Sequence, residues 1–348
     1  MGCIRRPGLR RGRAGGCRKN PGRPHASRSR GRLAAAPGQR RLNDGGCRVL
    51  ADVCPAAWAS LRMAAMPELP EVEVLVRHLA PLLRGRRIRG VDVRRAKSVR
   101  REGPADSATG LRGAVIEDVP RRAKFLVFRL RRPRAREPFV LLGHLGMTGR
   151  MWLQPRSAAL PKHTAVALGL GVHRWVFEDT RYFGRLSLDA APLAALGPEP
   201  WDDAFTPEAL RAALRRSRQA IKVRLLDQSL VAGVGNIYAS EALHRAGISP
   251  RRRAGGLRPA EVARLHAAIL DVLEEAVRFG STVPLDFAGA AERDGLFYYG
   301  RAEGTPDYYA ERLAVYDRAG RPCGRCGRPV RRLVQAARST YFCPGCQR

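Results

Sequence analysis

Four cysteines near the C-terminus have the spacing of a metal site. Cys323 and Cys326 form one C-x-x-C pair and Cys343 and Cys346 form another, with 16 residues between the pairs. Each pair can supply two corners of a thiolate tetrahedron around Zn2+, which is the pattern of a zinc ribbon. Two disulfides are the alternative, but nothing else in the sequence implies an oxidising compartment. We therefore predict one structural zinc ion bound by these four residues.

A glycine-bearing turn, VAGVGN at residues 231–236, lies between two predicted helices. The backbone N–H groups of such a turn, together with the side-chain amide of Asn236, can approach a phosphate closely. The alternative is the plain turn of a helical hairpin, because a Gly-x-Gly junction alone is a weak signal. The flanking residues are needed to decide between the two.

Acidic residues lie at the start of a predicted helix. The run MPELPEVE begins at Met66, and apolar residues then follow at positions 72, 75, 76, 79, 82 and 83. This spacing predicts a helix over 70–83, with Pro70 at its first position and glutamates near its positive end. Taken alone, Glu68 and Glu71 are ordinary helix N-terminal acids.

The elements that follow predict a two-part α+β fold. Short strands are predicted at residues 88–93, 114–119, 125–130, 139–142, 165–170, 175–179 and 185–188. The simplest arrangement is an N-terminal antiparallel β-sandwich with flanking helices. A helical domain then begins at Thr206, a cap followed by proline, and continues at 221–228, 238–245 and 259–278. The zinc ribbon ends the chain.

The chain of 348 residues is strongly basic, with Lys+Arg 64 against Asp+Glu 31 and a formal net charge of +33. At 45% hydrophobic residues it can still bury a core. No run approaches the roughly 18 apolar residues of a membrane span, so we expect no membrane partner. The charge indicates an acidic partner without choosing among DNA, RNA and other polyanions. Residues 1–65 are rich in Arg, Gly, Ala and Pro, and we expect them to be disordered.

The segment IKVRLLDQSLVAGVGNIYASE at 221–241 resembles the helix-two-turn-helix signature of the bacterial formamidopyrimidine-DNA glycosylase family. Four further segments are similar to that family in order and spacing. They are PELPEVE at 67–73, RRAKF at 121–125 with HLGMTG at 144–149, DTRYFG at 179–184, and the zinc ribbon with RSTY at 338–341. The resemblance covers residues 66–348 and implies a helix-two-turn-helix domain at 204–280.

The resemblance implies catalytic roles. A free N-terminal Pro67 would be the Schiff-base nucleophile, since an α-amine has a pKa of roughly 7.7–8.0 against about 10.4 for lysine. Glu68 would protonate the opening deoxyribose, and Glu71 would orient the nucleophile or a water. Lys124 would be the proton donor in β-elimination. Arg338 would be the donor in δ-elimination and would clamp the phosphates that flank the lesion.

The resemblance also implies residues that evert the damaged nucleotide, because a stacked base cannot be excised. Met147 and Phe183 would wedge into the base stack, and Arg181 would pair with the orphaned base. The remaining residues of this set would contact phosphates: His163, Arg218, Lys222 and Asn236.

The residues before Pro67 conflict with the implied chemistry, because a proline in a peptide bond has no amine. We expect translation to begin at Met66, followed by removal of the methionine. A cleavable transit segment at 1–65 is one alternative. A retained tail on a protein that binds DNA without cutting it is the other.

The expected organisation is a catalytic sandwich at 66–191, a linker at 192–203, the helix-two-turn-helix domain at 204–280, a lesion-recognition loop at 281–314 and a zinc ribbon at 315–348. The loop is longer and more aromatic over 281–312 than the family resemblance implies, so the substrate preference is less fixed than the reaction type.

The resemblance implies a monomeric, cytoplasmic bacterial protein at the nucleoid, with duplex DNA as partner and no redox cofactor. We expect it to excise oxidised purines such as 8-oxoguanine and formamidopyrimidines, and to cleave the abasic site by β,δ-elimination. The alternatives are a non-catalytic protein that binds damaged DNA and a glycosylase for oxidised pyrimidines.

Overall fold

The computed structural model describes residues 67–100, 110–133, 137–278 and 313–348. All the described residues belong to a single compact unit. The predicted disorder of residues 1–65 and the predicted aromatic loop at 281–312 therefore lie outside the described residues.

The first helix, α1 (Leu69–Leu83), begins at a capping box. Glu68 is its N-cap, and the side chain of Glu71 accepts a hydrogen bond from the Glu68 backbone N–H at 2.7 Å. The helix starts one residue earlier than predicted, so Pro70 is its second residue and not its first. One face of the helix is buried, so the local sequence determines both where α1 starts and which side meets the core.

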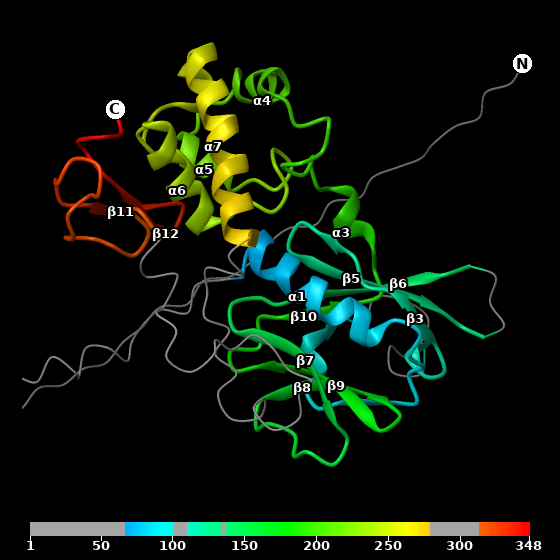
Figure 1. The fold of residues 1–348 in the computed structure, drawn as a ribbon. Coiled ribbons are helices and arrows are strands. Elements are labelled where there is room, and N and C mark those ends of the chain that lie inside the picture. The colour runs from blue at the N-terminus through cyan, green and yellow to red at the C-terminus, as the bar shows by residue number, and fades with distance from the viewer. Residues whose placement is uncertain (1–66, 101–109, 134–136, 279–312) are drawn as a thin grey trace, which may run out of the picture. The chain divides into compact units, whose positions relative to one another are not determined.

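Two sheets pack beside α1 (Figure 1). One sheet has the order β1 (Gly90–Val93), β8 (Thr164–Leu170), β9 (His173–Asp179) and β7 (Gly149–Pro155). The other has the order β2 (Val99–Arg100), β10 (Arg185–Ser187), β6 (Phe139–His144), β5 (Phe125–Arg131) and β3 (Val115–Asp118), with β4 (Arg121–Arg122) paired to β5. All pairs are antiparallel except β10 with β2. The α+β sandwich prediction is confirmed.

The sequence prediction missed strand β7. Its run GRMWLQP is almost continuously buried. Met151 and Leu153 belong to the main core on one face, whereas Trp152 packs with Val176 on the other. Because both faces are covered, the polar–apolar alternation that identifies a strand is missing.

The helical part follows a short helix, α3 (Ala191–Ala194), and 3-10 turns occur at η2 (Ala96–Ser98) and η3 (Ala254–Gly256). Its helices are α4 (Pro207–Leu214), α5 (Ile221–Leu225), α6 (Asn236–Ala246) and α7 (Pro259–Arg278). As predicted, Thr206 caps α4 by accepting the Ala209 N–H at 3.1 Å. Gly247, with φ of +72°, ends α6 in the left-handed region. The apolar faces of these helices form a second core.

The zinc-ribbon segment contains an antiparallel hairpin of β11 (Arg331–Gln335) and β12 (Arg338–Phe342). Its two-residue turn places Ala336 and Ala337 at φ of 47° and 58°. Both central residues of such a turn need positive φ, which glycine or asparagine adopts more readily than alanine. Arg338 follows this turn directly and starts β12.

Within the described residues, no helix combines the length and the apolar character needed to cross a bilayer.

Candidate active site and zinc centre

The carboxylate of Glu68 lies where the first turns of two helices meet. It directly precedes α1, and its Oε1 and Oε2 accept the backbone N–H groups of Ile237 at 2.9 Å and Tyr238 at 3.4 Å, in the first turn of α6. The residue is 1% exposed. Burial raises the pKa of this carboxyl, while the nearby Lys124 ammonium acts to lower it. Glu68 therefore holds a proton to higher pH than an ordinary glutamic acid.

The two glycines of the predicted anion-binding turn make this contact possible. A Cβ at Gly235 would lie 2.4 Å from Oε1 of Glu68, and a Cβ at Gly233 would lie 2.3 Å from a methyl of Leu69. Gly233 also has φ of +97°. The turn thus receives the protein's own carboxylate at the start of α6. The approach of a phosphate to the N–H groups of residues 231–236 stays a prediction, because the groups that bind Glu68 belong to the next two residues, Ile237 and Tyr238.

Glu71 supports Glu68 from within α1. Its Oε2 accepts the Glu68 N–H at 2.7 Å, and its Oε1 accepts the phenol O–H of Tyr238 at 2.7 Å. Glu71 is completely buried, and Pro67, the residue before Glu68, is buried as well. Glu71 therefore fixes the backbone beside Pro67. The sequence had suggested that it orients a nucleophile or a water.

Three cationic side chains gather on the side of Glu68 that carries Lys124. Lys124 and Lys222 both lie near Glu68, and Arg338 lies near the two lysines, so these charges shift the pKa values of Lys124 and Lys222. Burial lowers the pKa of Lys124 and lowers the pKa of Lys222 to about 8. The nearby Glu68 carboxylate opposes both shifts, and Arg338 adds to them. The structure thus brings together residues that are more than 200 positions apart in the sequence.

Asn236 connects this cluster to the zinc-ribbon hairpin. Its Oδ1 accepts a hydrogen bond from Lys222 Nζ at 2.6 Å, and its Nδ2 donates to the backbone carbonyl of Ser339 at 2.9 Å. Its side chain also lies near Tyr316, whose ring packs edge-on against Tyr341. Lys222 is fully buried. The two residues expected to contact phosphate therefore hydrogen-bond each other, next to Arg338.

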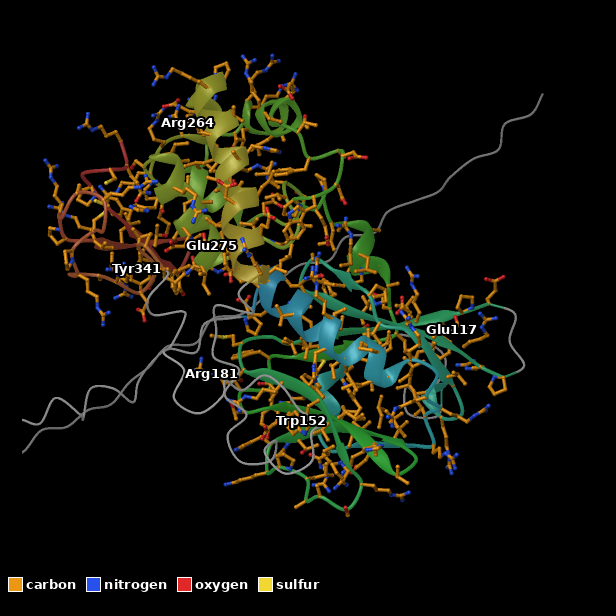
Figure 2. The ribbon with its side chains drawn as sticks, in the orientation of Figure 1. Glu117, Trp152, Arg181, Arg264, Glu275 and Tyr341 are labelled. Carbon is orange, nitrogen blue, oxygen red and sulfur yellow. The ribbon has the colours of Figure 1, made fainter. Side chains whose placement is uncertain are left out.

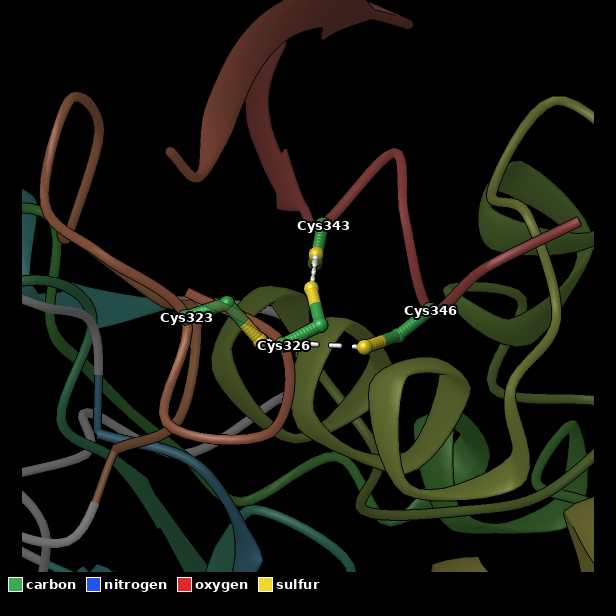
Figure 3. A group of neighbouring side chains, drawn as sticks. All are labelled: Cys323, Cys326, Cys343 and Cys346. Carbon is green, nitrogen blue, oxygen red and sulfur yellow. Dashed lines mark hydrogen bonds between the residues drawn. The ribbon is translucent and has the colours of Figure 1, made fainter. Parts of the chain in front are cut away.

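The four predicted zinc ligands converge (Figure 3). All four sulfurs lie within 4.8 Å of one another, with Cys323–Cys346 and Cys326–Cys343 separations of 3.8 and 3.4 Å. A tetrahedron with Zn–S bonds of about 2.3 Å has edges of about 3.8 Å, so the four thiols fit one zinc ion. These separations are far longer than the roughly 2.0 Å of a disulfide. Four protein ligands leave no open position, so zinc would be structural.

The residues expected to evert a nucleotide lie on two loops of the sandwich. Met147 is partly buried between β6 and β7, and Arg181 and Phe183 are exposed between β9 and β10. Figure 2 labels Arg181. Phe183 is 54% exposed, which is unusual for a large apolar side chain. His163 lies near the second loop, with its Nδ1 3.2 Å from the Tyr182 hydroxyl. Arg218 is exposed before α5, and no contact connects it to the Glu68 cluster within the described residues.

Several residues that shape the site were not assigned a role from the sequence. Glu199 accepts the Ala123 N–H at 2.5 Å and pairs with Arg121 at 2.7 Å, which fixes the turn before Lys124, where Ala123 has φ of 52°. Glu241 is buried in α6 and accepts three backbone N–H groups of residues 314–316. The role of each of these glutamates depends on a tertiary contact, and a local sequence pattern does not reveal such contacts.

Comparison with known proteins agrees with this architecture. Three family models match: the formamidopyrimidine-DNA glycosylase N-terminal domain at residues 66–186, its H2TH domain at 196–285, and the zinc finger found in FPG and IleRS at 320–348. The formamidopyrimidine-DNA glycosylase of Symbiobacterium thermophilum is 44% identical over 293 residues, covering 81% of this chain and 89% of that protein.

Solved structures agree with the same assignment. The MutM (Fpg) protein of Thermus thermophilus is 40% identical with a TM-score of 0.67, covering 81% of this chain and 98% of that one. The Lactococcus lactis Fpg in complex with abasic-site DNA is 30% identical with a TM-score of 0.71, covering 81% of this chain and 100% of that one. The chain therefore belongs to the formamidopyrimidine-DNA glycosylase family of DNA-repair enzymes.

Proposed function

We propose that this protein is a bifunctional DNA glycosylase and abasic-site lyase, with Pro67 as nucleophile and Glu68 as its acid. The observation that carries the proposal is the Glu68 carboxyl, buried next to Pro67 at the start of α6, with Lys124 and Lys222 near it and Arg338 near the two lysines. Solved relatives hold DNA with Fapy-dG, with carbocyclic 8-oxo-G and with an abasic site, which supports oxidised purines as substrates.

The chemistry follows from the placement of these groups. The Pro67 nitrogen attacks C1′ of the damaged nucleoside, the glycosidic bond breaks, and the base leaves. Glu68 donates a proton to the deoxyribose ring oxygen, so the sugar opens and a Schiff base forms. The Glu68 carboxylate, which has given up its proton, takes the C2′ proton, the C3′–O bond breaks, and Lys124 donates a proton to the departing 3′ phosphate. In the δ-elimination the C4′ proton is lost to water, the C5′–O bond breaks, and Arg338 is the donor to the departing 5′ phosphate.

This sequence of steps requires Pro67 at the mature N-terminus. The first family model begins at residue 66, which agrees with a functional start at Met66 and loss of that methionine. Met147, Arg181 and Phe183 fill the space that the everted nucleotide leaves, and His163, Arg218, Lys222 and Asn236 contact phosphates. The enzyme works on the bacterial nucleoid in the cytoplasm.

Borohydride trapping tests the nucleophile. Protein that begins at Pro67 should form a covalent adduct with an 8-oxoguanine duplex, and Pro67→Gly should lose most of it. Protein extended to Met1 should form none, because its Pro67 nitrogen is in a peptide bond. Failure of the Pro67 protein to form an adduct, or an equal adduct with Pro67→Gly, would overturn the mechanism.

The residues before Pro67 give one specific reason for a second function, non-catalytic binding of damaged DNA. Intact-mass measurement of the native protein separates the two functions. A mature mass that begins at Pro67 supports catalysis. A mass that includes residue 1, combined with lesion binding and no trapped adduct, supports binding alone. A duplex with thymine glycol, excised faster than 8-oxoguanine, would instead indicate the oxidised-pyrimidine specificity.

A further inference from the structure

Two loops of the sandwich meet at one buried carboxylate. Asp179 is the last residue of β9 and is completely buried. The first loop, residues 145–148, joins β6 to β7, and the second, residues 180–184, joins β9 to β10. All three residues proposed to replace the everted nucleotide lie on these loops.

Asp179 accepts hydrogen bonds from both loops. Its Oδ1 accepts the Thr148 hydroxyl of the first loop at 2.5 Å and the Arg181 N–H of the second at 3.1 Å. Its Oδ2 accepts the Gly184 N–H at 2.6 Å. The Thr148 hydroxyl oxygen also accepts the Arg181 N–H at 3.2 Å, which connects the loops a second time. One carboxylate therefore fixes three points on two loops.

The backbones of the loops are in direct contact at these points. Gly146 has φ of +66°, and a Cβ there would lie 2.4 Å from the backbone nitrogen of Gly184. A Cβ at Gly184 would lie 2.5 Å from the Phe177 ring and 2.9 Å from the carbonyl oxygen of Leu145. Two glycines thus allow an approach that no side chain would permit.

The fixed atoms lie at the base of the loops, whereas the side chains of the second loop that would enter DNA are exposed. Asp179 binds the backbone at Arg181 and Gly184, on either side of Phe183, whose side chain is 54% exposed. Inserting an apolar side chain between two nucleobases costs unstacking energy, so the loop that carries the side chain must be held rigidly where it leaves the sheet. A loop that is not held there would bend away from the DNA instead.

We propose that Asp179 is a positioning residue that joins the two loops into a single rigid wedge, so that Met147, Arg181 and Phe183 enter the DNA together. The inference rests on the proposed function, because it assumes that these three residues replace the everted nucleotide. A carboxylate suits the position because it only accepts, and all its donors here are O–H or N–H groups. An asparagine at this position would place its own NH2 group opposite one of these donors, and that donor would lose its acceptor.

Thr148 offers the sharpest test, because it is not among the residues assigned to DNA contact. Thr148→Val keeps the shape and removes the hydroxyl, whereas Thr148→Ser keeps the hydroxyl. The substrate is an 8-oxoguanine duplex with 2-aminopurine beside the lesion, so that fluorescence reports eversion and single-turnover kinetics report excision. The second substrate is a single-stranded oligonucleotide with a preformed abasic site, which needs the Pro67 centre but no replacement of a stacked base.

Thr148→Val should slow eversion and duplex excision by roughly tenfold or more, while Thr148→Ser stays within about twofold of the wild type. Both should cleave the single-stranded abasic site within about twofold of the wild type. Asp179→Asn should resemble Thr148→Val or be more severe. If Asp179→Asn does not fold, the comparison of Thr148→Val with Thr148→Ser still tests the inference.

Three results would overturn the inference. Wild-type eversion by Thr148→Val would show that the shared hydrogen bonds do not position the wedge. Equal loss on both substrates would indicate a general structural role. Wild-type excision by Met147→Ala, Arg181→Ala and Phe183→Ala would refute the wedge assignment of the proposed function, and this inference with it. Impaired excision by those three with a normal Thr148→Val would refute the inference alone.

Discussion

Gly235 leaves room for the carboxylate on which the proposed chemistry depends. An alanine there would place Cβ 2.4 Å from Oε1 and 2.6 Å from Oε2 of Glu68, so the carboxylate must move. The backbone φ of −130° at this position suits alanine, so the fold should survive. We expect Gly235→Ala to lower single-turnover excision by roughly 100-fold, since small misplacements of catalytic groups have such effects.

Gly256→Ala provides the matched control. A Cβ there would come no closer than 4.0 Å to any neighbour, so excision and melting temperature should stay near the wild-type values. Excision of 8-oxoguanine at the wild-type rate by Gly235→Ala would contradict the importance of where Glu68 lies.

Lys222 should leave a signature in the pH dependence of stability. Burial lowers its pKa to about 8, against 10.5 for an ordinary lysine, so between these values the unfolded chain binds more protons than the folded one. Stability should therefore rise with pH across this window, by an amount on the order of 3 kcal/mol. Below pH 8 both states are protonated, and the full cost of burying the charge remains.

This contribution can be measured by urea unfolding of the wild type and of Lys222→Met at pH values from about 7.5 to about 10. The quantity compared is the change in the free energy of unfolding of each protein over this range. Lys222→Met cannot titrate at this position, so its stability should lack most of the rise that the wild type shows. Parallel curves for the two proteins would mean that Lys222 has an ordinary pKa in the folded state.

At the scale of elements, α6 holds the segment that leads into the zinc ribbon. Glu241 of α6 is 7% exposed and accepts the backbone N–H groups of Ala314, Val315 and Tyr316 at 2.7 to 2.9 Å. Glu241→Gln would turn an amide NH2 toward these donors and leave buried N–H groups unpaired. We expect a loss of about 1–3 kcal/mol and faster hydrogen exchange over 313–348.

Glu275→Gln is the control for charge removal. Glu275 of α7, labelled in Figure 2, pairs with Arg245 of α6, and the side chains of Arg245 and Glu275 are 39% and 35% exposed. Exposed pairs contribute little, so stability should change by less than about 1 kcal/mol. Equal effects of the two substitutions on exchange over 313–348 would contradict the anchoring role of Glu241.

The sequence predicted those elements whose signals are local. Helix α7 spans Pro259–Arg278, the predicted range, because proline starts it and its apolar residues keep helical spacing. Helix α5 ends at Leu225, three residues before the predicted end, because residues 226–228 enter the turn that leads to Gly233. Strand β7 escaped prediction because it is buried on both faces.

The sequence predicted which residues belong to the site, but it did not predict which residues they hydrogen-bond. The resemblance singled out Glu68 and Asn236, but it did not show that Glu68 binds the first turn of α6 or that Asn236 bonds Lys222. Such contacts join segments more than 160 residues apart or close a turn in three dimensions. Buried acceptors such as Asp179 and Glu241 give no periodic signal, because each is explained only by the donors that folding brings to it.

On the scale of the whole molecule, the zinc ribbon is joined to both ends of α6. Asn236 at its start bonds Ser339 at 2.9 Å, and Arg325 donates to the carbonyl of His244 near its end at 3.2 Å. Gln347 adds a bond to the Ile248 carbonyl at 2.9 Å. The ribbon thus places Arg338 beside the Glu68 cluster, although its own apolar core is small.

Loss of zinc should therefore displace Arg338 from the proposed active site, although the metal itself takes no part in the reaction. Cys346→Ser should release the metal, because four thiolates close the coordination sphere, and residues 313–348 should lose protection from exchange. Arg338→Ala is the matched variant: zinc and fold should remain, while phosphate-dependent binding and δ-elimination fall. Metal content by mass spectrometry, anisotropy on lesion DNA and the ratio of β- to δ-products separate the two. Normal binding and cleavage by a zinc-free Cys346→Ser protein would show that the metal is not what holds Arg338 against the DNA.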